Sequence, residues 1–276
     1  MRYVIIIFLT FSLFISCVSE TEHQKTLDEN SALKSELNDI KFGAPNLLKN
    51  GKKFFEVRDY KTAREKFNML LERHSDLPEA IECKKYLAII DEEELWELAN
   101  NSKNISDVTN YIDKYSNGKY INQAKNLKDK ISLLNMQNAY SSAEETNTSY
   151  AWKQFLSEYP NHTDAENIKI KIIKLEVDEI YGNSETGKLP SLNQHNYGNS
   201  TTSTVTIINN TGCDLVVRYS GISIESNTIS AGSTSNITLP SGNYKIAATA
   251  CGKNYAGLEY LSGDYSCTYY IRTVRF

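Results

Sequence analysis

The sequence has no apolar run long enough to cross a bilayer, which takes roughly 20 residues. Its main apolar stretch, Val4 to Ile15, falls short of that length. The four histidines do not stand at a metal-ligand spacing from one another or from a cysteine. The glycines are separated by strand-like segments, so no glycine-rich phosphate loop is indicated. With no catalytic set in view, the sequence predicts a protein that is not an enzyme and takes no metal or cofactor.

Positive charge is also in short supply. The chain has 30 Lys and Arg against 34 Asp and Glu, and the cations are interleaved with acids, as in residues 61–66 and 91–97. Binding to nucleic acid by counterion release needs Lys and Arg clustered on one face. These mixed runs are typical of solvated helix faces, so nucleic acid is not a predicted partner.

What is present begins at the N-terminus. Arg2, the apolar stretch and the small residue Ser16 form the pattern of a secretory signal. With the sequence LFISC over residues 13–17, this segment resembles a bacterial lipoprotein signal and its lipobox. The resemblance implies a signal peptide at 1–16, an acylated Cys17, and an outer-membrane lipid anchor on the periplasmic face or at the cell surface. The alternatives are an ordinary cleaved signal and an uncleaved anchor.

Residues 17–43 are polar and have few apolar anchors, so we expect a tether with some helix near 31–37. The next segment, 44–182, is helical in pattern and holds a weak internal repeat. Four side chains at i, i+3, i+4 and i+7 lie on one helix face, and such a stripe recurs about 41 and then about 44 residues later. The stripes are Phe67, Leu70, Leu71 and His74; Val108, Tyr111, Ile112 and Tyr115; and Trp152, Phe155, Leu156 and Tyr159.

The first unit of this repeat carries further signals, namely Leu47, Gly51, Phe54, Ala63 and Phe67. They fall where a tetratricopeptide repeat has its aromatic or Leu, Gly, Tyr, Ala and Phe, and the region therefore resembles such repeats in bacterial outer-membrane lipoproteins. The resemblance implies an all-α, TPR-like solenoid of helix pairs with a groove for a protein or peptide of the cell envelope. The residues expected to pack the repeats are Gly51, Phe54, Ala63, Phe67, Leu71, Val108, Ile112, Tyr115, Trp152, Leu156 and Tyr159.

A Gly-, Ser-, Asn- and Thr-rich segment at 183–203 predicts a flexible linker. From 204 to 276 the period changes to two, and turn signals separate short strand-like runs. The expected strands are 204–208, 215–219, 222–224, 236–239, 244–249 and 265–271. This pattern predicts a small all-β antiparallel sandwich, with a small barrel as the alternative.

A domain this small benefits from a covalent staple. Cys251 and Cys267 are the first choice for a disulfide, with 15 residues between them, and either could instead pair with Cys213. No histidine lies in the domain to activate a thiol, which argues against a nucleophilic cysteine.

Tyrosine is heavily used, with 18 in the chain. In the last domain Tyr255, Tyr260, Tyr269 and Tyr270 lie close together in sequence and are candidates for a binding surface. Exposed aromatics can stack on sugar rings or anchor an interface, whereas buried tyrosines simply pack strands. The sequence therefore predicts a non-enzymatic envelope scaffold that binds protein through its helices. The alternative is a glycan- or peptidoglycan-binding lipoprotein that acts through these tyrosines.

Overall fold

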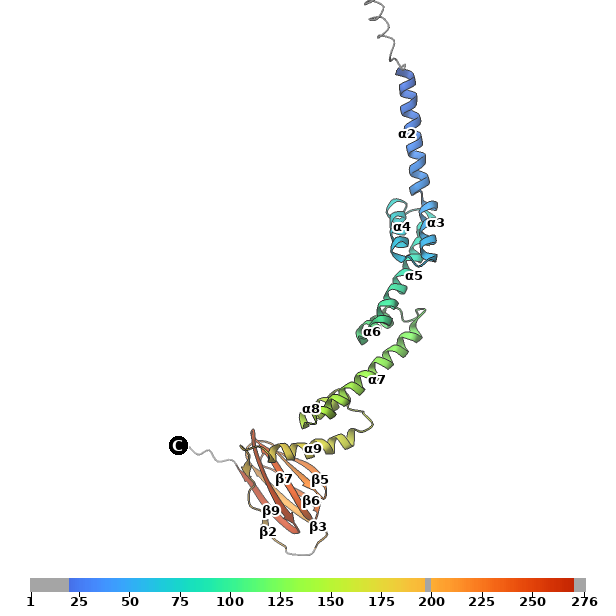
Figure 1. The fold of residues 1–276 in the computed structure, drawn as a ribbon. Coiled ribbons are helices and arrows are strands. Elements are labelled where there is room, and N and C mark those ends of the chain that lie inside the picture. The colour runs from blue at the N-terminus through green and yellow to red at the C-terminus, as the bar shows by residue number, and fades with distance from the viewer. Residues whose placement is uncertain (1–19, 197–199, 271–276) are drawn as a thin grey trace, which may run out of the picture. The chain divides into compact units, whose positions relative to one another are not determined.

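The computed structural model describes residues 20–196 and 200–270 (Figure 1). The helices are α2 (Glu20–Phe42), α3 (Ala44–Glu56), α4 (Tyr60–Arg73), α5 (Pro78–Asn101), α6 (Ile105–Lys114), α7 (Ile121–Thr146), α8 (Ser149–Glu158) and α9 (Ala165–Tyr181). The strands are β1 (Gly187–Lys188), β2 (Asn193–Gln194), β3 (Thr202–Asn210), β4 (Leu215–Gly221), β5 (Ile224–Ile229), β6 (Thr234–Pro240), β7 (Gly242–Ala250), β8 (Lys253–Leu261) and β9 (Gly263–Tyr270). The predicted order of helices followed by a β-rich region is confirmed. The chain divides into two compact units, and the division falls within α7, between Ser132 and Leu133.

In the first unit, residues 20–42 of the segment predicted as a tether with a little helix form a continuous helix, α2. Helix-forming residues favour helical backbone without burial, so a shortage of apolar anchors does not exclude a helix. Helices α3, α4 and α5 then share one apolar cluster, built around Leu47, Phe67 and Ile90. A second cluster joins α5, α6 and the first half of α7 around Val108, Tyr111 and Ala124.

The contact between α3 and α4 follows from the small residues in the repeat pattern. Pro45 lies in the first turn of α3, where its missing N–H costs nothing, and the Asp59 side chain caps α4 by accepting a hydrogen bond from Thr62 N at 3.1 Å. A Cβ at Gly51 would lie 2.3 Å from Cε1 of Phe67. The glycine therefore lets the fully buried Phe67 ring rest against the α3 backbone.

The first three members of each stripe predicted from the sequence lie on a short helix, and the fourth is the residue at its C-cap. The first two members are buried. These are Phe67 and Leu70 on α4, Val108 and Tyr111 on α6, and Trp152 and Phe155 on α8. Leu71, Ile112, Tyr115, Leu156 and Tyr159 are partly buried against the same clusters, as is Phe54. Ala80, Ala124 and Ala165 open the following helices as buried small residues. The sequence pattern thus identified the packed face of every short helix in this region.

In the second unit, two β-sheets enclose the main core (Figure 1). Sheet A has the strand order β1-β8-β7-β4-β5, and sheet B has the order β2-β9-β3-β6. Alternate residues of each strand point inward, as in β3, where Val205 and Ile207 are buried and their neighbours are not. The two-sheet arrangement was predicted, but an antiparallel sandwich is wrong in detail, because β3 pairs in parallel with β9 and β1 in parallel with β8. Strand runs alone do not fix pairing direction.

The prediction of a flexible linker at 183–203 is wrong for much of the segment, because parts of it belong to the sandwich. β1 adds to the edge of sheet A and β2 to the edge of sheet B, and between them Leu189 and Leu192 pack on the sandwich core. Two-residue strands are too short to show a period. Strand β8 was also missed, because its inward Gly257 and outward Ala256 blur the alternation that marks a strand.

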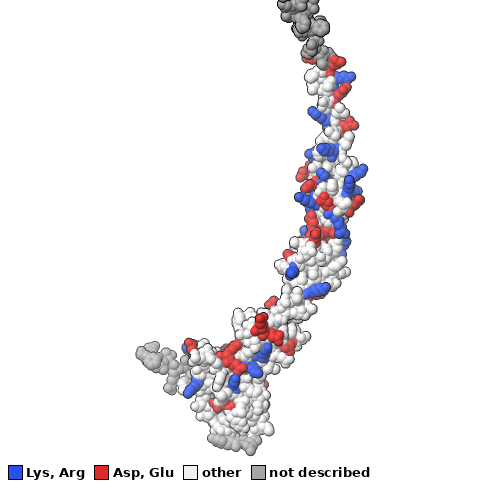
Figure 2. All heavy atoms as spheres, viewed as in Figure 1, with Lys and Arg blue, Asp and Glu red and all other residues white. Residues whose placement is uncertain are grey.

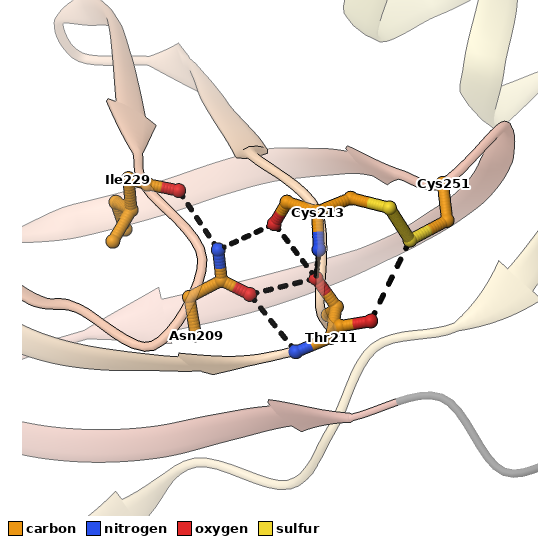
Figure 3. Close-up of a disulfide and its surroundings, with 5 residues drawn as sticks. All are labelled: Asn209, Thr211, Cys213, Ile229 and Cys251. Atoms are coloured by element: carbon orange, nitrogen blue, oxygen red, sulfur yellow. Dashed lines mark hydrogen bonds between the residues drawn. A yellow bond between two sulfur atoms is a disulfide. The ribbon is translucent and has the colours of Figure 1, made fainter.

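The disulfide joins Cys213 and Cys251, so the first-choice pair of Cys251 with Cys267 is wrong and the alternative partner Cys213 is correct. Cys267 points into the core from the middle of sheet B, where it is buried as a free thiol. The two bonded cysteines lie in the β3–β4 loop and in the turn between β7 and β8 (Figure 3). Loop cysteines at one end of a sandwich meet more readily than a loop cysteine and an interior one.

A buried asparagine supports this corner (Figure 3). The side-chain amide of Asn209 donates to the carbonyl oxygens of Cys213 and Ile229, each at 2.8 Å. Its Oδ1 accepts hydrogen bonds from the backbone N–H and the hydroxyl of Thr211. Sγ of Cys251 lies 3.5 Å from Thr211 O, a contact without a hydrogen bond because a disulfide sulfur carries no proton. Asn209 thereby satisfies the backbone of the loop that holds Cys213.

Candidate functional site

The outer face of sheet A is divided between a covered part and an open part. Helix α9 covers the first part, where it contacts β4, β5, β7 and β8. Ala247 points away from the sandwich core on β7 and is nevertheless fully buried, as is Val177 on the helix. A small residue on the strand lets the helix approach, so α9 is packed as an integral layer of this domain.

An ion-pair network fastens α9 to the sheet. Glu176 Oε2 accepts a hydrogen bond from Arg218 Nε at 2.6 Å, and both side chains are only about a tenth exposed, at 12% and 11%. Lys153 of α8 bonds the other oxygen of the same carboxylate. Arg218 also donates to Thr249 at 3.2 Å. Burial acts to raise the pKa of Glu176, but the hydrogen bonds from Lys153 and Arg218 outweigh it and the pKa is lowered.

Beside this network lies a recess of about 350 Å³, the first candidate site. It is lined from α9, β4, β5, β7 and β8 by Lys174, Asp178, Ser220, Gly221, Ile224, Asn243, Tyr244, Lys245 and Leu258. Lys245 Nζ donates to Asp178 Oδ1 at 2.8 Å, and this bond raises the pKa of Lys245. The Lys245 ammonium also lies 5.5 Å from the centre of the Tyr181 ring. The recess thus holds hydroxyl, amide, ammonium and carboxylate groups in one place.

Apolar side chains flank the recess on the sheet. In the register of β7 and β8, Lys245 pairs with Leu258 and Asn243 pairs with Tyr260. Leu258 is 62% exposed and Tyr260 is 64% exposed. Charged side chains are sparse on the strands, and the face of the domain in Figure 2 is mostly white. An exposed aromatic beside an amide and an ion pair can stack on a flat apolar ring while its neighbours bond hydroxyl groups.

The structure separates the four tyrosine candidates. The prediction that Tyr269 is an exposed binding residue is wrong, because Tyr269 is buried in the sandwich core. Tyr255 is partly buried against the same core, and the centres of the two rings are 6.5 Å apart. Their positions in β9 and β8 point inward. Tyr260 and Tyr270 point outward and are exposed, but on different sheets. Tyr260 does not line the recess, but it pairs with Asn243, which does. Successive side chains of a strand point to opposite faces, and this alternation decides which tyrosines are exposed.

A second candidate site lies on α5 in the first unit. A shallow groove of about 510 Å³ is lined by Pro78, Ile81, Glu82, Lys85, Tyr86 and Ile89. Ile81 is 64% exposed and Ile89 is 43% exposed. Glu82 forms an ion pair with Lys52 of α3 at 2.5 Å, and Tyr86 packs beneath against Phe67. The groove therefore combines an apolar floor with charged edges.

Other features bear on the sequence predictions. Within residues 20–196 and 200–270, His, Cys, Asp and Glu form no group of three or more that could hold a metal ion. Over the same residues, none of the helices has the length and apolar character needed to cross a membrane. Cys17, the predicted lipidation site, and the signal segment 1–16 lie outside the described residues.

Comparison with known families locates one match. The family described as a domain of unknown function (DUF6759) matches residues 179–272, from the last turn of α9 to the end of the sandwich. No curated protein and no solved structure matches the chain. The C-terminal part is therefore similar to a family whose function is not described.

Proposed function

We propose that the protein is a non-enzymatic binding protein whose helical region docks a protein or peptide of the cell envelope. In this proposal the helix pairs act as degenerate, TPR-like repeats. Support comes from the recurrence of one packed stripe on α4, α6 and α8, with Gly51 and Ala63 at a close helix contact. Repeats of this kind present extended surfaces suited to helices or extended chains.

The groove on α5 is the observation that carries the proposal. Ile81 and Ile89 are large apolar side chains left in solvent, eight residues apart on one face of the helix. A partner helix or strand with apolar side chains would bury them, and its own charges would meet Glu82 and Lys85 at the edges. Apolar anchors surrounded by polar groups are typical of protein interfaces.

The test uses the full chain in its own envelope, with one double variant of the groove and one control. We expect Ile81→Asp combined with Ile89→Asp to reduce recovery of cross-linked envelope proteins by at least about tenfold, since each change places a charge at the apolar contact. Leu98→Asp is the control, because the exposure of Leu98 on α5 falls between those of Ile81 and Ile89 and Leu98 lies outside the groove. Recovery of the same proteins by the groove variant would remove the helical region from the binding role.

We further propose that Cys17 carries a lipid that anchors the chain to the outer membrane, on its periplasmic face or at the cell surface. The lipobox-like sequence at 13–17 supports this assignment. Cys17→Ala is expected to move the protein from the membrane fraction to the soluble fraction, because no lipid would then be attached. Retention of that variant as an integral membrane protein would contradict the lipid anchor.

A second candidate function is binding of a glycan or peptidoglycan at the recess beside α9. Tyr260, exposed next to Asn243 and the Lys245–Asp178 pair, favours it. Glycan arrays probed with the full chain test the idea, and Tyr260→Ala should weaken any binding by about 1 kcal/mol or more. Tyr150→Ala is the control, since Tyr150 is 70% exposed on α8, a helix that contributes no residue to the lining of the recess. An array without any bound sugar polymer would end this candidate.

A further inference from the structure

Among the described residues, helix α2 packs against other elements only near its C-terminal end. It runs for 23 residues, and none of them is buried. Leu33, Leu37 and Ile40 are 60 to 64% exposed, although they lie on one side of the helix at i, i+4 and i+7. At the C-terminal end of α2, Phe42 packs against the apolar cluster shared by α3, α4 and α5. A helix draws most of its stability from an apolar face packed on something else.

The apolar side chains fit a heptad repeat. With Leu37 at position a and Leu33 and Ile40 at position d, the earlier a positions are His23 and Asn30 and the earlier d position is Thr26. An asparagine at a single a position is the feature that specifies two strands and fixes their register, at a cost in stability. The seam is therefore polar toward the N-terminus and apolar toward the C-terminus.

The flanking charges complement a second copy of the same helix. In this register position g holds only glutamates, Glu22, Glu29 and Glu36, and position e holds Lys34 and Lys41 after Leu27. In a parallel two-stranded coiled coil, each g residue meets the e residue five positions later on the partner helix. Glu29 then faces Lys34 of the other copy, and Glu36 faces Lys41. An antiparallel pair would instead bring glutamates opposite glutamates.

We infer that α2 joins two copies of this chain as a parallel, two-stranded coiled coil. The occupant of its exposed face is a second α2, with Leu33, Leu37 and Ile40 in the seam and the Asn30 side chains bonded to each other. This inference concerns residues 20–42 alone and does not depend on the proposed binding function. Parallel pairing brings the N-terminal ends of the two chains together.

Cysteine cross-linking of the full chain tests both the contact and its direction. Thr26→Cys and Leu37→Cys place thiols at d and a, where partner side chains face each other, while Ser35→Cys places one at f, on the opposite side. Under mild oxidation we expect both seam variants to form covalent dimers about tenfold above Ser35→Cys, because a disulfide needs Cβ atoms about 4 Å apart. The unsubstituted chain gives the background from its own cysteines.

Each other result overturns the inference. An antiparallel pair can bring like positions together at only one point, so cross-linking at 26 or 37 but not at both would exclude parallel pairing. Equal cross-linking at 35 would exclude a defined seam. No dimer above background from either seam variant would show that α2 is not joined to a second copy.

Charge reversal gives a second, independent measurement that leaves the seam intact. Glu29→Lys with Glu36→Lys should make the full chain monomeric in sedimentation equilibrium, and so should Lys34→Glu with Lys41→Glu, because like charges then face each other. An equimolar mixture of the two variants should restore the dimer as a heterodimer. Dimers of either variant alone, or a mixture that stays monomeric, would contradict the charge pairing.

Discussion

At the scale of single residues, the sandwich depends on Asn209. Its side chain is completely buried and makes hydrogen bonds to the backbone at Thr211, Cys213 and Ile229. Leaving buried carbonyl and N–H groups without partners costs about 1–3 kcal/mol each. Asn209, a polar residue at an inward strand position, therefore stabilises the loop that holds Cys213 of the disulfide.

We expect Asn209→Ala to lower the free energy of unfolding of the second unit by about 2–3 kcal/mol. Asn210→Ala is the control, because Asn210 follows on the same strand and is exposed, and its replacement should change stability by no more than about 0.5 kcal/mol. Urea unfolding followed by circular dichroism measures both. Equal effects of the two substitutions would show that the buried amide does not support the loop.

A glycine tests the helix contact in the first unit. In an exposed helix Gly→Ala stabilises by about 1 kcal/mol, but at Gly51 the new Cβ would overlap the ring of Phe67. Overpacking of this kind costs about 1–3 kcal/mol, so we expect Gly51→Ala to destabilise on balance. Thermal unfolding measures the change, and adding Phe67→Leu should recover part of it. A more stable Gly51→Ala variant would mean that α3 and α4 separate freely.

The cysteines and tyrosines show where residue-level prediction stopped. Sequence spacing favoured Cys251 with Cys267, but strand parity turns Cys267 into the core, and only the fold brings the loop of Cys213 to the turn at Cys251. Parity also sends Tyr269 inward and its neighbour Tyr270 outward. Alternation was visible in the sequence, but which face is the inner one was not, because that depends on how two sheets meet.

At the scale of elements, the helices were the easiest to predict. The i, i+3, i+4, i+7 stripes identified the packed faces of α4, α6 and α8 because local geometry fixes that period. Strand β8 was not predicted because its inward Gly257 is small while Leu258 and Tyr260 point outward, so the apolar residues do not alternate with polar ones. The recess beside α9 could not be predicted from the sequence either, because its lining comes from five elements that only the fold brings together.

The docking of α9 depends on one buried carboxylate. Glu176→Gln would leave Arg218 buried without a charged partner, and breaking such a pair costs about 3 kcal/mol or more. The pKa of Glu176 is lower in the folded state than in the unfolded state. The stabilisation that its carboxylate gives the folded state is therefore complete when the pH is well above the unfolded-state pKa, and it is lost as the pH falls through the folded-state pKa. We expect the stability difference between wild type and Glu176→Gln to be full at neutral pH and to shrink below about pH 4.5.

Asp178→Asn provides the comparison on the same helix. The Asp178–Lys245 pair is more than 40% exposed on both sides, so its loss should cost no more than about 1 kcal/mol. Urea unfolding at several pH values separates the two variants. A pH-independent gap between wild type and Glu176→Gln would show that the ionised carboxylate does not fasten α9.

At the scale of the whole molecule, the chain divides into two units, and the disulfide that the described residues form lies in the second. This disulfide ties distant segments, and its cysteines are 38 positions apart. Closing a loop of that length stabilises the folded state by about 4 kcal/mol in the chain-entropy treatment. Reduction should therefore affect the two units unequally.

The two tryptophans of the chain report on the two units separately, since Trp96 lies in the first and the buried Trp152 in the second. In a Trp96→Phe variant, fluorescence follows the second unit alone, and reductant should lower its urea midpoint to an extent equivalent to about 4 kcal/mol. In a Trp152→Phe variant, Trp96 fluorescence should give the same midpoint with and without reductant. Helix α9 packs on sheet A, and Trp152 packs against α9 in the cluster of α7, α8 and α9. We therefore expect the second unit to unfold cooperatively, so that loss of the disulfide also lowers the urea midpoint reported by Trp152. A change in the Trp96 midpoint on reduction would mean that the two units unfold together. An unchanged Trp152 midpoint would mean that α7, α8 and α9 unfold independently of the sandwich.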